Sequence, residues 1–249
     1  MCALQQRARR GITMSKAKAS TSGTKISHLA LIPDGNRRWS KNNRINILQG
    51  YSKGINKFLE FCEWSKEVGI STLTVWALST ENLRNRSKHE LAVLYHLYVR
   101  AARDRNVLER LDRGRIRFKI IGNMKVLPRN LRDALHSLET RTKDYTSFTI
   151  NMLINYGGRD DLVHAVKYLS GRKGKVTEEA IREHLRSADI PEVDLIVRTS
   201  GEQRVSGLLP WQAAYSELYF APKYWPDFEK KDFKKAIEAY SKRQRRYGK

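Results

Sequence analysis

The sequence has few of the features that mark secreted, disulfide-bonded or membrane-spanning proteins. It contains two cysteines in 249 residues, Cys2 and Cys62, which is too few for a disulfide framework or a cysteine-based metal site. No apolar run approaches the roughly 18 residues that a membrane span requires. No apolar stretch follows the first basic residues, as a secretory signal would require. These absences predict a protein of a reducing compartment, and we expect it in the cytoplasm.

Acidic residues are scarce relative to basic ones. The chain has 48 Lys and Arg against 26 Asp and Glu, a formal net charge of +22. Such a surplus attracts an anionic partner, which could be nucleic acid, an anionic membrane surface or a phosphorylated small molecule. A basic nucleic-acid-binding module is therefore one hypothesis, but the aromatic motifs of RNA-binding domains are absent. Peripheral contact with an anionic membrane is compatible with the charge.

The first 27 residues differ in composition from the rest. They hold six basic and no acidic residues and almost no apolar pattern. This composition is typical of a disordered extension, and we expect residues 1–27 to lie outside the fold. No internal repeat or linker interrupts residues 28–249. We therefore expect that stretch to form a single domain.

Short apolar runs alternate with helical patterns along that domain. This alternation predicts an α/β fold with a mainly parallel central sheet covered by helices on both faces. The GxGxxG fingerprint of dinucleotide-binding folds is missing after the first predicted strand, so a nicotinamide enzyme is disfavoured. The expected strands are 29–32, 70–78, 116–121, 148–154 and 193–197, and the expected helices are 55–62, 91–102, 127–138, 160–169, 177–186 and 233–240.

The stretch from His28 to Trp39 carries the clearest functional signal. A buried-strand pattern ends at Pro33-Asp34-Gly35-Asn36, which turns the chain into a loop with one carboxylate, one amide and, at Arg37 and Arg38, two guanidiniums. Carboxylates bind hard cations, and planar guanidiniums suit phosphate oxygens. This loop predicts a site for a diphosphate and a metal ion. An ordinary strand-to-helix turn, capped by Asn36 or Asp34, is the alternative.

Four later blocks follow this one in the chain, and the loops after the predicted strands can converge at one edge of the sheet. Together the five blocks resemble the signature of the cis-prenyltransferases, the undecaprenyl diphosphate synthase family. The later blocks are 77–82 (ALSTEN), 155–159 (NYGGR), 194–206 (DLIVRTSGEQRVS) and 211–228 (WQAAYSELYFAPKYWPDF).

The resemblance implies a magnesium-dependent enzyme that joins an allylic prenyl diphosphate to a second C5 isoprenoid diphosphate and releases diphosphate. It implies that Asp34 and Glu217 bind Mg²⁺ and that Asp34 is catalytic. Ser79 and Asn82 resemble the pair that positions the reacting end and assists proton removal. Each of these two residues would otherwise be a common helix cap.

The resemblance also implies the residues that bind the two substrates. On the allylic side they are Gly35, Asn36, Arg37, Arg38, Trp39, Tyr51 and Arg86, with Arg86 one residue further from Asn82 than the family spacing. On the homoallylic side they are Arg198, Arg204 and Ser206. The terminal Arg246 and Gly248 resemble an Arg-x-Gly tail that completes the partner's site in a homodimer. The chain is therefore expected to be a homodimer; a non-catalytic partner subunit is disfavoured because the charged loop residues are all present.

Two departures from the family pattern bear on the product. Ile47 and Tyr51 stand where the family carries an Arg and a His on the allylic diphosphate. Met152, Leu153 and Ile154 stand at a strand end where long-chain members carry small residues, and they would fill the product cavity. The first departure resembles a small branch of the family that makes irregular, branched (lavandulyl-type) products, and the second predicts a short product. An ordinary cis-elongating polyprenyl diphosphate synthase using isopentenyl diphosphate is the alternative.

Overall fold

The computed structural model describes residues 25–171 and 175–243, so most of the predicted N-terminal extension lies outside it. The described residues form a six-stranded sheet in which every paired neighbour runs parallel, in the order β3-β4-β2-β1-β5-β6. The predicted parallel sheet is thus confirmed. The strands are β1 (His28–Ile32), β2 (Thr72–Ser79), β3 (Ile116–Ile121), β4 (Phe148–Tyr156), β5 (Leu195–Arg198) and β6 (Glu217–Phe220).

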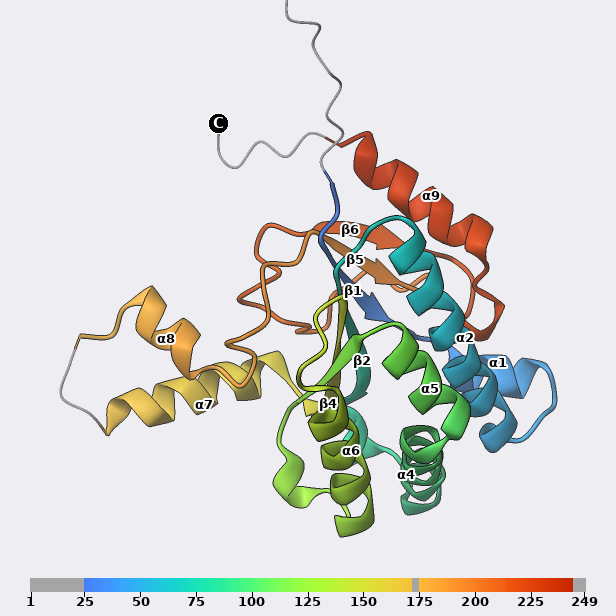
Figure 1. Cartoon of the computed structure of the whole chain (residues 1–249), viewed down its shortest axis with the longest axis horizontal. Coiled ribbons are helices and arrows are strands. Elements are labelled where there is room, and N and C mark those ends of the chain that lie inside the picture. The colour runs from blue at the N-terminus through green and yellow to red at the C-terminus, as the bar shows by residue number, and fades with distance from the viewer. Residues whose placement is uncertain (1–24, 172–174, 244–249) are drawn as a thin grey trace, which may run out of the picture.

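One face of the sheet is covered by a layer of helices (Figure 1). This layer contains the larger apolar core, in which Phe61 of α2 contacts the rings of Trp225, Phe228 and Phe233 at centroid distances of 5.1 to 6.0 Å. The helices are α1 (Asn36–Asn42), α2 (Ile47–Glu67), α3 (Thr80–Asn85), α4 (Lys88–Arg103), α5 (Arg105–Arg113), α6 (Arg129–Thr142) and α9 (Lys230–Ser241). None of the helices within the described ranges is both long and apolar enough to cross a membrane.

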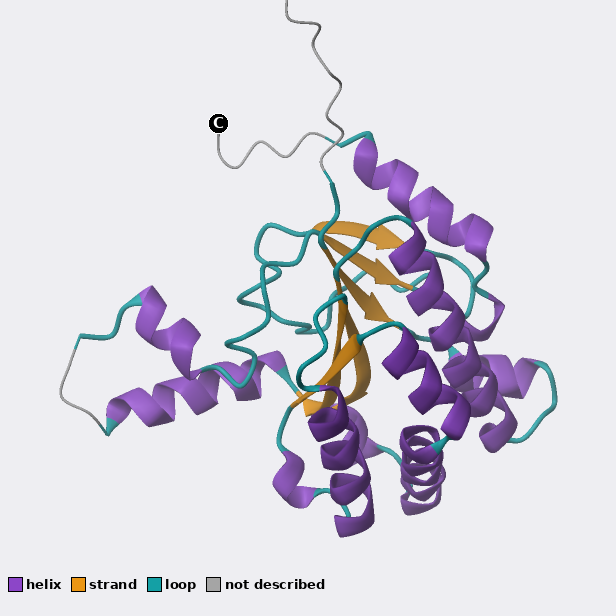
Figure 2. Ribbon diagram, viewed as in Figure 1, coloured by secondary structure: helices purple, strands orange, loops and turns teal. Residues whose placement is uncertain are grey.

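The second face is covered mainly by long loops, and α7 (Gly158–Ser170) and α8 (Glu178–His184) extend away from it (Figure 2). A smaller core forms here, where Ala30 and Leu153 of the sheet meet Ile190, Leu208 and Leu209 from the loops. The sequence patterns missed α1, α3, α5 and β6, which are short or carry few apolar residues. They also did not indicate that loops would cover so much of this face.

A polar group of side chains lies inside the sheet, near its amino-terminal edge. His28 is 1% exposed. Its Nδ1 lies 3.0 Å from the carbonyl of Pro191, and its Nε2 lies 2.8 Å from the hydroxyl of Thr74. That hydroxyl also accepts a hydrogen bond from Asn151 at 3.1 Å. The neutral ring, donating from Nδ1 and accepting at Nε2, satisfies every one of these contacts.

Burial of His28 makes stability depend on pH. Burial lowers the pKa of His28 below its ordinary value of 6.5, and this outweighs the carbonyls of Pro191 and Glu192, which act to raise it. The unfolded chain therefore takes up this proton at a higher pH than the folded chain. The stability that the neutral ring contributes is fully present above pH 6.5, the pKa of His in the unfolded chain. It is lost as the pH falls through the lower pKa that His28 has in the folded protein.

We predict that the free energy of unfolding, measured by urea titration, falls between pH 7 and pH 5 and that His28→Asn removes most of this slope. His89, which is exposed on α4, provides the control. His89→Gln should leave the slope unchanged. An unchanged slope in His28→Asn would show that another group controls the pH dependence.

Candidate active site

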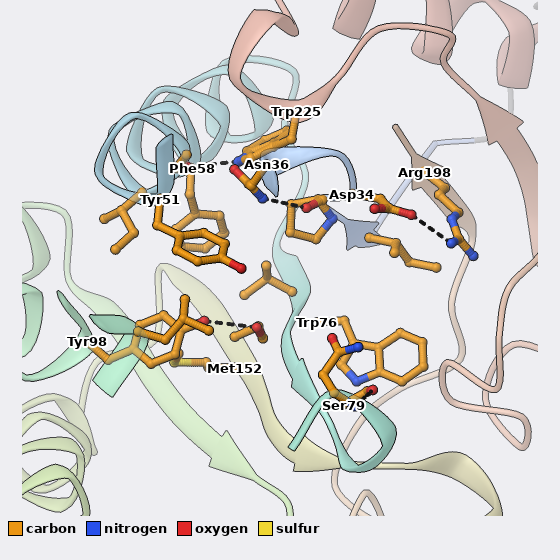
Figure 3. Close-up of a pocket in the computed structure, with 18 of the residues that line it drawn as sticks. Asp34, Asn36, Tyr51, Phe58, Trp76, Ser79, Tyr98, Met152, Arg198 and Trp225 are labelled. Atoms are coloured by element: carbon orange, nitrogen blue, oxygen red, sulfur yellow. Dashed lines mark hydrogen bonds and ion pairs between the residues drawn. The ribbon is translucent and has the colours of Figure 1, made fainter. Parts of the chain in front are cut away.

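The loops that follow β1, β2, β4 and β5 meet at the carboxyl edge of the sheet, around one large pocket. Its volume is about 1170 Å³, which exceeds the roughly 300 to 1,000 Å³ of pockets that hold drug-sized ligands. One end is polar and the other is apolar. Figure 3 shows Asp34 and Arg198 facing each other, with Tyr51, Tyr98 and Met152 pointing into the pocket. The polar end is lined by Asp34, Gly35, Asn36, Arg37, Arg38, Arg198, Arg204 and Ser206.

An ion pair between Asp34 and Arg198 is at the centre of the polar end. Arg198, at the end of β5, is 5% exposed and donates to a carboxylate oxygen of Asp34 at 2.8 Å. It also donates to the carbonyl of Arg204 at 2.6 Å and to the hydroxyl of Ser206 at 2.8 Å. Burial alone would raise the pKa of Asp34, but Arg198 and Arg38 outweigh it and lower that pKa. Asp34 is therefore an anion throughout the neutral range.

The turn after Asp34 depends on Gly35, which has φ +103° and precedes α1. A Cβ at this position would lie 2.7 Å from the ring of Tyr224 and 3.1 Å from Ser200, so only glycine fits. Asn36 donates to the carbonyl of Pro33 at 3.0 Å, while its buried side-chain oxygen has no hydrogen-bond partner. This tight turn places Gly35 and Asn36 at the wall of the pocket.

Arg38 and Arg204 share one carboxylate, that of Glu202. Arg38 donates to Glu202 at 2.8 Å, to the hydroxyl of Ser200 at 2.7 Å and to Asp34 at 3.4 Å. Arg204 donates to the other oxygen of Glu202. These contacts lower the pKa of Glu202, with the bond from Arg204 the largest cause. Sequence reasoning did not predict a role for Glu202, although its place between two arginines of one motif was a signal.

A second shared carboxylate, Glu90, organises the opposite side of the polar end. It accepts from the hydroxyl of Tyr51 at 2.5 Å and lies 3.2 Å from Arg86 and 3.4 Å from Arg37. Burial, then the contact with Glu90, raises the pKa of Tyr51 although the charge of Arg86 opposes this shift. The Tyr51 hydroxyl thus donates its hydrogen bond to Glu90. Sequence analysis missed Glu90, for which the i,i+4 spacing from Arg86 was the available signal.

Ser79 and Asn82 both line the pocket, at the start of α3. The hydroxyl of Ser79 accepts from the backbone N–H of Asn82 at 3.0 Å, so it caps the helix. The side-chain oxygen of Asn82 accepts from Arg86 at 3.1 Å. Ser79 is thus a helix cap, which was the alternative to its catalytic role. The cap and the bond from Arg86 hold Asn82 at the pocket wall. The part of Ser79 and Asn82 in proton removal stays a prediction.

The apolar end reaches far into the helical layer. It is lined by residues from β3, β4, α4, α5 and α6, including Leu94, Leu111, Phe118, Leu138 and Met152. Of the three residues expected to fill this cavity, Met152 lines it, whereas the expectation was wrong for Leu153 and Ile154. Neither of these two lines the pocket, and Leu153 packs in the core on the other face of the sheet. Successive residues of a strand point to opposite faces, so Met152 and Leu153 cannot both face the cavity.

Trp39 and Glu217, which were predicted to bind substrate and metal, do not line the pocket of this chain. Trp39 is 7% exposed and does not line the pocket; Lys53 lies over its ring at 4.3 Å. Glu217 is the first residue of β6 and pairs with Leu195, the first residue of β5, whereas Arg198 at the end of β5 pairs with Phe220. Glu217 therefore lies at the amino-terminal ends of these strands, and Asp34 follows the carboxyl end of β1. Glu217 accepts from Arg243 at 2.6 Å. Within one chain Glu217 does not join Asp34 at the pocket, and its role as a metal ligand stays a prediction. The predicted tail residues Arg246 and Gly248 lie outside the described residues.

The donor set of the polar end fits a magnesium ion that arrives with a diphosphate. The Asp34 side chain is 31% exposed and faces the pocket. Among the described residues, no group of three or more His, Cys, Asp or Glu could hold a metal ion. Mg²⁺ commonly takes one or two carboxylates and completes its coordination with water and substrate phosphates. Asp34 is the residue of this chain that would hold it, beside arginines that can bind the same diphosphate.

Comparisons with known proteins agree on one family. The family model described as undecaprenyl diphosphate synthase matches residues 32–248. A tritrans,polycis-undecaprenyl-diphosphate synthase (geranylgeranyl-diphosphate specific) of Thermoplasma acidophilum is 43% identical over 228 residues, covering 89% of this chain and 88% of that protein. An isoprenyl transferase of Thermotoga maritima is 43% identical over 226 residues, covering 89% and 96%.

Solved structures give the same result. Lavandulyl diphosphate synthase of Lavandula x intermedia, in complex with dimethylallyl diphosphate, matches with a TM-score of 0.85 and 32% identity, covering 90% of this chain and 99% of that one. A probable undecaprenyl diphosphate synthase of Campylobacter jejuni matches with a TM-score of 0.75 and 30% identity, covering 91% and 100%.

We predict that Arg198→Ala weakens binding of inorganic diphosphate, measured by calorimetry with magnesium present. A charge-assisted hydrogen bond contributes roughly 1.5 to 3 kcal/mol, or about ten- to a hundredfold in affinity. Arg105→Ala, at a side chain that is 91% exposed on α5, should have no effect. Equal affinity in the Arg198 variant and the unmodified protein would exclude Arg198 from the anion site.

Proposed function

The chain belongs to the undecaprenyl diphosphate synthase family of prenyltransferases, and we propose that it is an elongating member, which adds isopentenyl diphosphate units to an allylic prenyl diphosphate. The single observation that carries this proposal is the pocket itself. It joins a cluster of arginines around Asp34 to a deep apolar cavity in a volume of about 1170 Å³. A diphosphate bound at the polar end would direct its hydrocarbon chain into the apolar end.

The polar end supplies two groups of anion-binding side chains on either side of Asp34. Arg198, Arg204 and Ser206 form one group, and the Gly35 turn with Arg38 forms the other. We assign the first to isopentenyl diphosphate and the second to the allylic diphosphate. Their proximity to one carboxylate supports transfer between two diphosphate substrates.

The difficult step is departure of diphosphate from the allylic carbon, which leaves a delocalised cation. Positive charge arranged in advance around the departing anion lowers that barrier. A magnesium ion, when bound, neutralises phosphate oxygens and so makes diphosphate a better leaving group. In this chain Arg38 and Arg198 add fixed positive charge, while Asp34 stays ionised to hold the ion. Ser79 and Asn82, at the wall between the polar and apolar ends, are our candidates for orienting the reacting carbon and its proton.

A second candidate function is coupling of two dimethylallyl-type units to a short, branched product. The observation that favours it is the altered allylic side, where Ile47 offers no hydrogen bond and Tyr51 donates to Glu90. The similarity to lavandulyl diphosphate synthase is compatible with it. The depth of the apolar end favours elongation instead, because a short product would leave most of that cavity unfilled.

The discriminating experiment is mass spectrometry of products formed with magnesium from dimethylallyl diphosphate alone, and from farnesyl or geranylgeranyl diphosphate with labelled isopentenyl diphosphate. Elongation predicts label in a linear polyprenyl diphosphate and no product from dimethylallyl diphosphate alone. A branched product of two units would support the second candidate.

We also propose that the protein is a homodimer, which sedimentation analysis would test.

We predict that Asp34→Asn lowers kcat by about 10² to 10³-fold, the range seen when one group that stabilises the transition-state charge is lost. The change preserves size, so circular dichroism should be unaltered. Asp227→Asn, at a carboxylate whose side chain is 51% exposed away from the pocket, is the matched control and should retain activity. Near-normal turnover of Asp34→Asn would refute the role of Asp34.

We predict that Met152→Ala lengthens the products, because Met152 lines the apolar end. Leu153→Ala should leave the product distribution unchanged, since Leu153 lies on the other face of the sheet. It should instead destabilise the protein by roughly 2 to 5 kcal/mol, because it removes a fully buried side chain. Chromatography of the products and urea unfolding would separate the two effects. Longer products from Leu153→Ala would contradict the orientation of β4.

A further inference from the structure

Tyr98 connects the helical layer to the sheet across the apolar end of the pocket. It lies on α4, and its hydroxyl donates to the backbone carbonyl of Ala77 on β2 at 2.9 Å. Both residues line the pocket. The hydrogen bond therefore holds an aromatic ring between two walls of the cavity, the helical layer and the sheet.

The carbonyl of Ala77 is available because β2 bulges at this residue. Trp76 pairs with Leu153 and Leu78 pairs with Ile154, so one residue of β2 is extra relative to β4. On the other side of β2, pairing with β1 ends at Val75. A bulged residue leaves the strand ladder, and its carbonyl then needs another donor when it is buried. Burial raises the pKa of Tyr98 to about 12, so the hydroxyl keeps its proton at neutral pH.

Tyr98 occupies an intermediate position along the pocket. The lining residues of α4 run from Leu94 through Tyr98 to Ala101 and Ala102. The bulky ring therefore comes before two alanines, which leave space next to Leu111, Phe118 and Leu138 from the neighbouring elements. Figure 3 shows Tyr98 and Met152 pointing into the pocket from the side away from Asp34. A hydrocarbon chain that starts at Asp34 meets this ring before it reaches the innermost space.

We propose that Tyr98, held across the cavity by its hydrogen bond to Ala77, limits the length of the polyprenyl product. This inference rests on the proposed elongating function. Each added unit pushes the far end of the chain deeper, until it meets the ring. Further growth requires the ring to move, which breaks the hydrogen bond and leaves the Ala77 carbonyl unpaired in an apolar cavity. Release of the product then competes successfully with another addition.

The test is the product distribution of Tyr98→Phe and Tyr98→Ala, with farnesyl or geranylgeranyl diphosphate as primer and labelled isopentenyl diphosphate. Tyr98→Phe keeps the ring and loses the anchor, so it should give longer products. Tyr98→Ala should lengthen and broaden the distribution further. Ala101→Leu, which narrows the innermost space, should shorten it.

Tyr95→Phe is the matched control, because Tyr95 lies on the same helix and does not line the pocket. It should leave chain lengths unchanged. Identical distributions from unmodified enzyme, Tyr98→Phe and Ala101→Leu would overturn the inference, even if Tyr98→Ala fails to fold in circular dichroism. An unmodified enzyme that incorporates no isopentenyl diphosphate would instead refute the proposed function, so the two failures are distinguishable.

Discussion

The contact between Asp34 and Arg198 is the interaction on which the polar end depends. It joins the loop after β1 to the end of β5, which are adjacent strands of the sheet although 164 residues separate them in the chain. Arg198 is almost fully buried, so loss of its carboxylate partner would leave a charge without compensation. The same guanidinium holds the Arg204 carbonyl and Ser206 in place. One buried cation therefore orders both Asp34, the carboxylate proposed to bind the metal ion, and the loop that faces it.

A second constraint is the balance of charge around that pair. Arginines at the polar end outnumber the carboxylates, and each of Asp34, Glu90 and Glu202 is shared between two of them. Sharing keeps the arginines ordered before a substrate binds and still leaves net positive charge for a diphosphate. Part of the +22 surplus of the chain is thus placed where the proposed chemistry needs it.

The apolar end meets a different requirement of the proposed function, because a growing hydrocarbon chain would need a space from which water is excluded. The helical layer supplies it without weakening the core, since residues such as Leu111 and Leu138 contribute to both. The bulge at Ala77 places a polar anchor within this apolar wall. In the proposed function, charge therefore selects the substrate head group, whereas the shape of the cavity controls how much hydrocarbon fits.

Much of the fold was predictable from local signals, because the short apolar runs at 29–32, 70–78 and 148–154 reflect strands buried on both faces. The loop around Asp34 stood out by its residues, and Arg198 came from the resemblance to the family; the predicted sheet added that these loops can converge at the carboxyl ends of its strands. Local pattern could not reveal that Glu90 and Glu202 hold the arginines, or that Trp39 and Glu217 point elsewhere. It also could not decide whether Leu153 or Met152 faces the cavity, because periodicity does not say which face of a doubly covered strand is hollow. Only the packing of distant elements decides these points: a side chain's role follows from which neighbours the fold brings to it, and those neighbours are far away in the sequence.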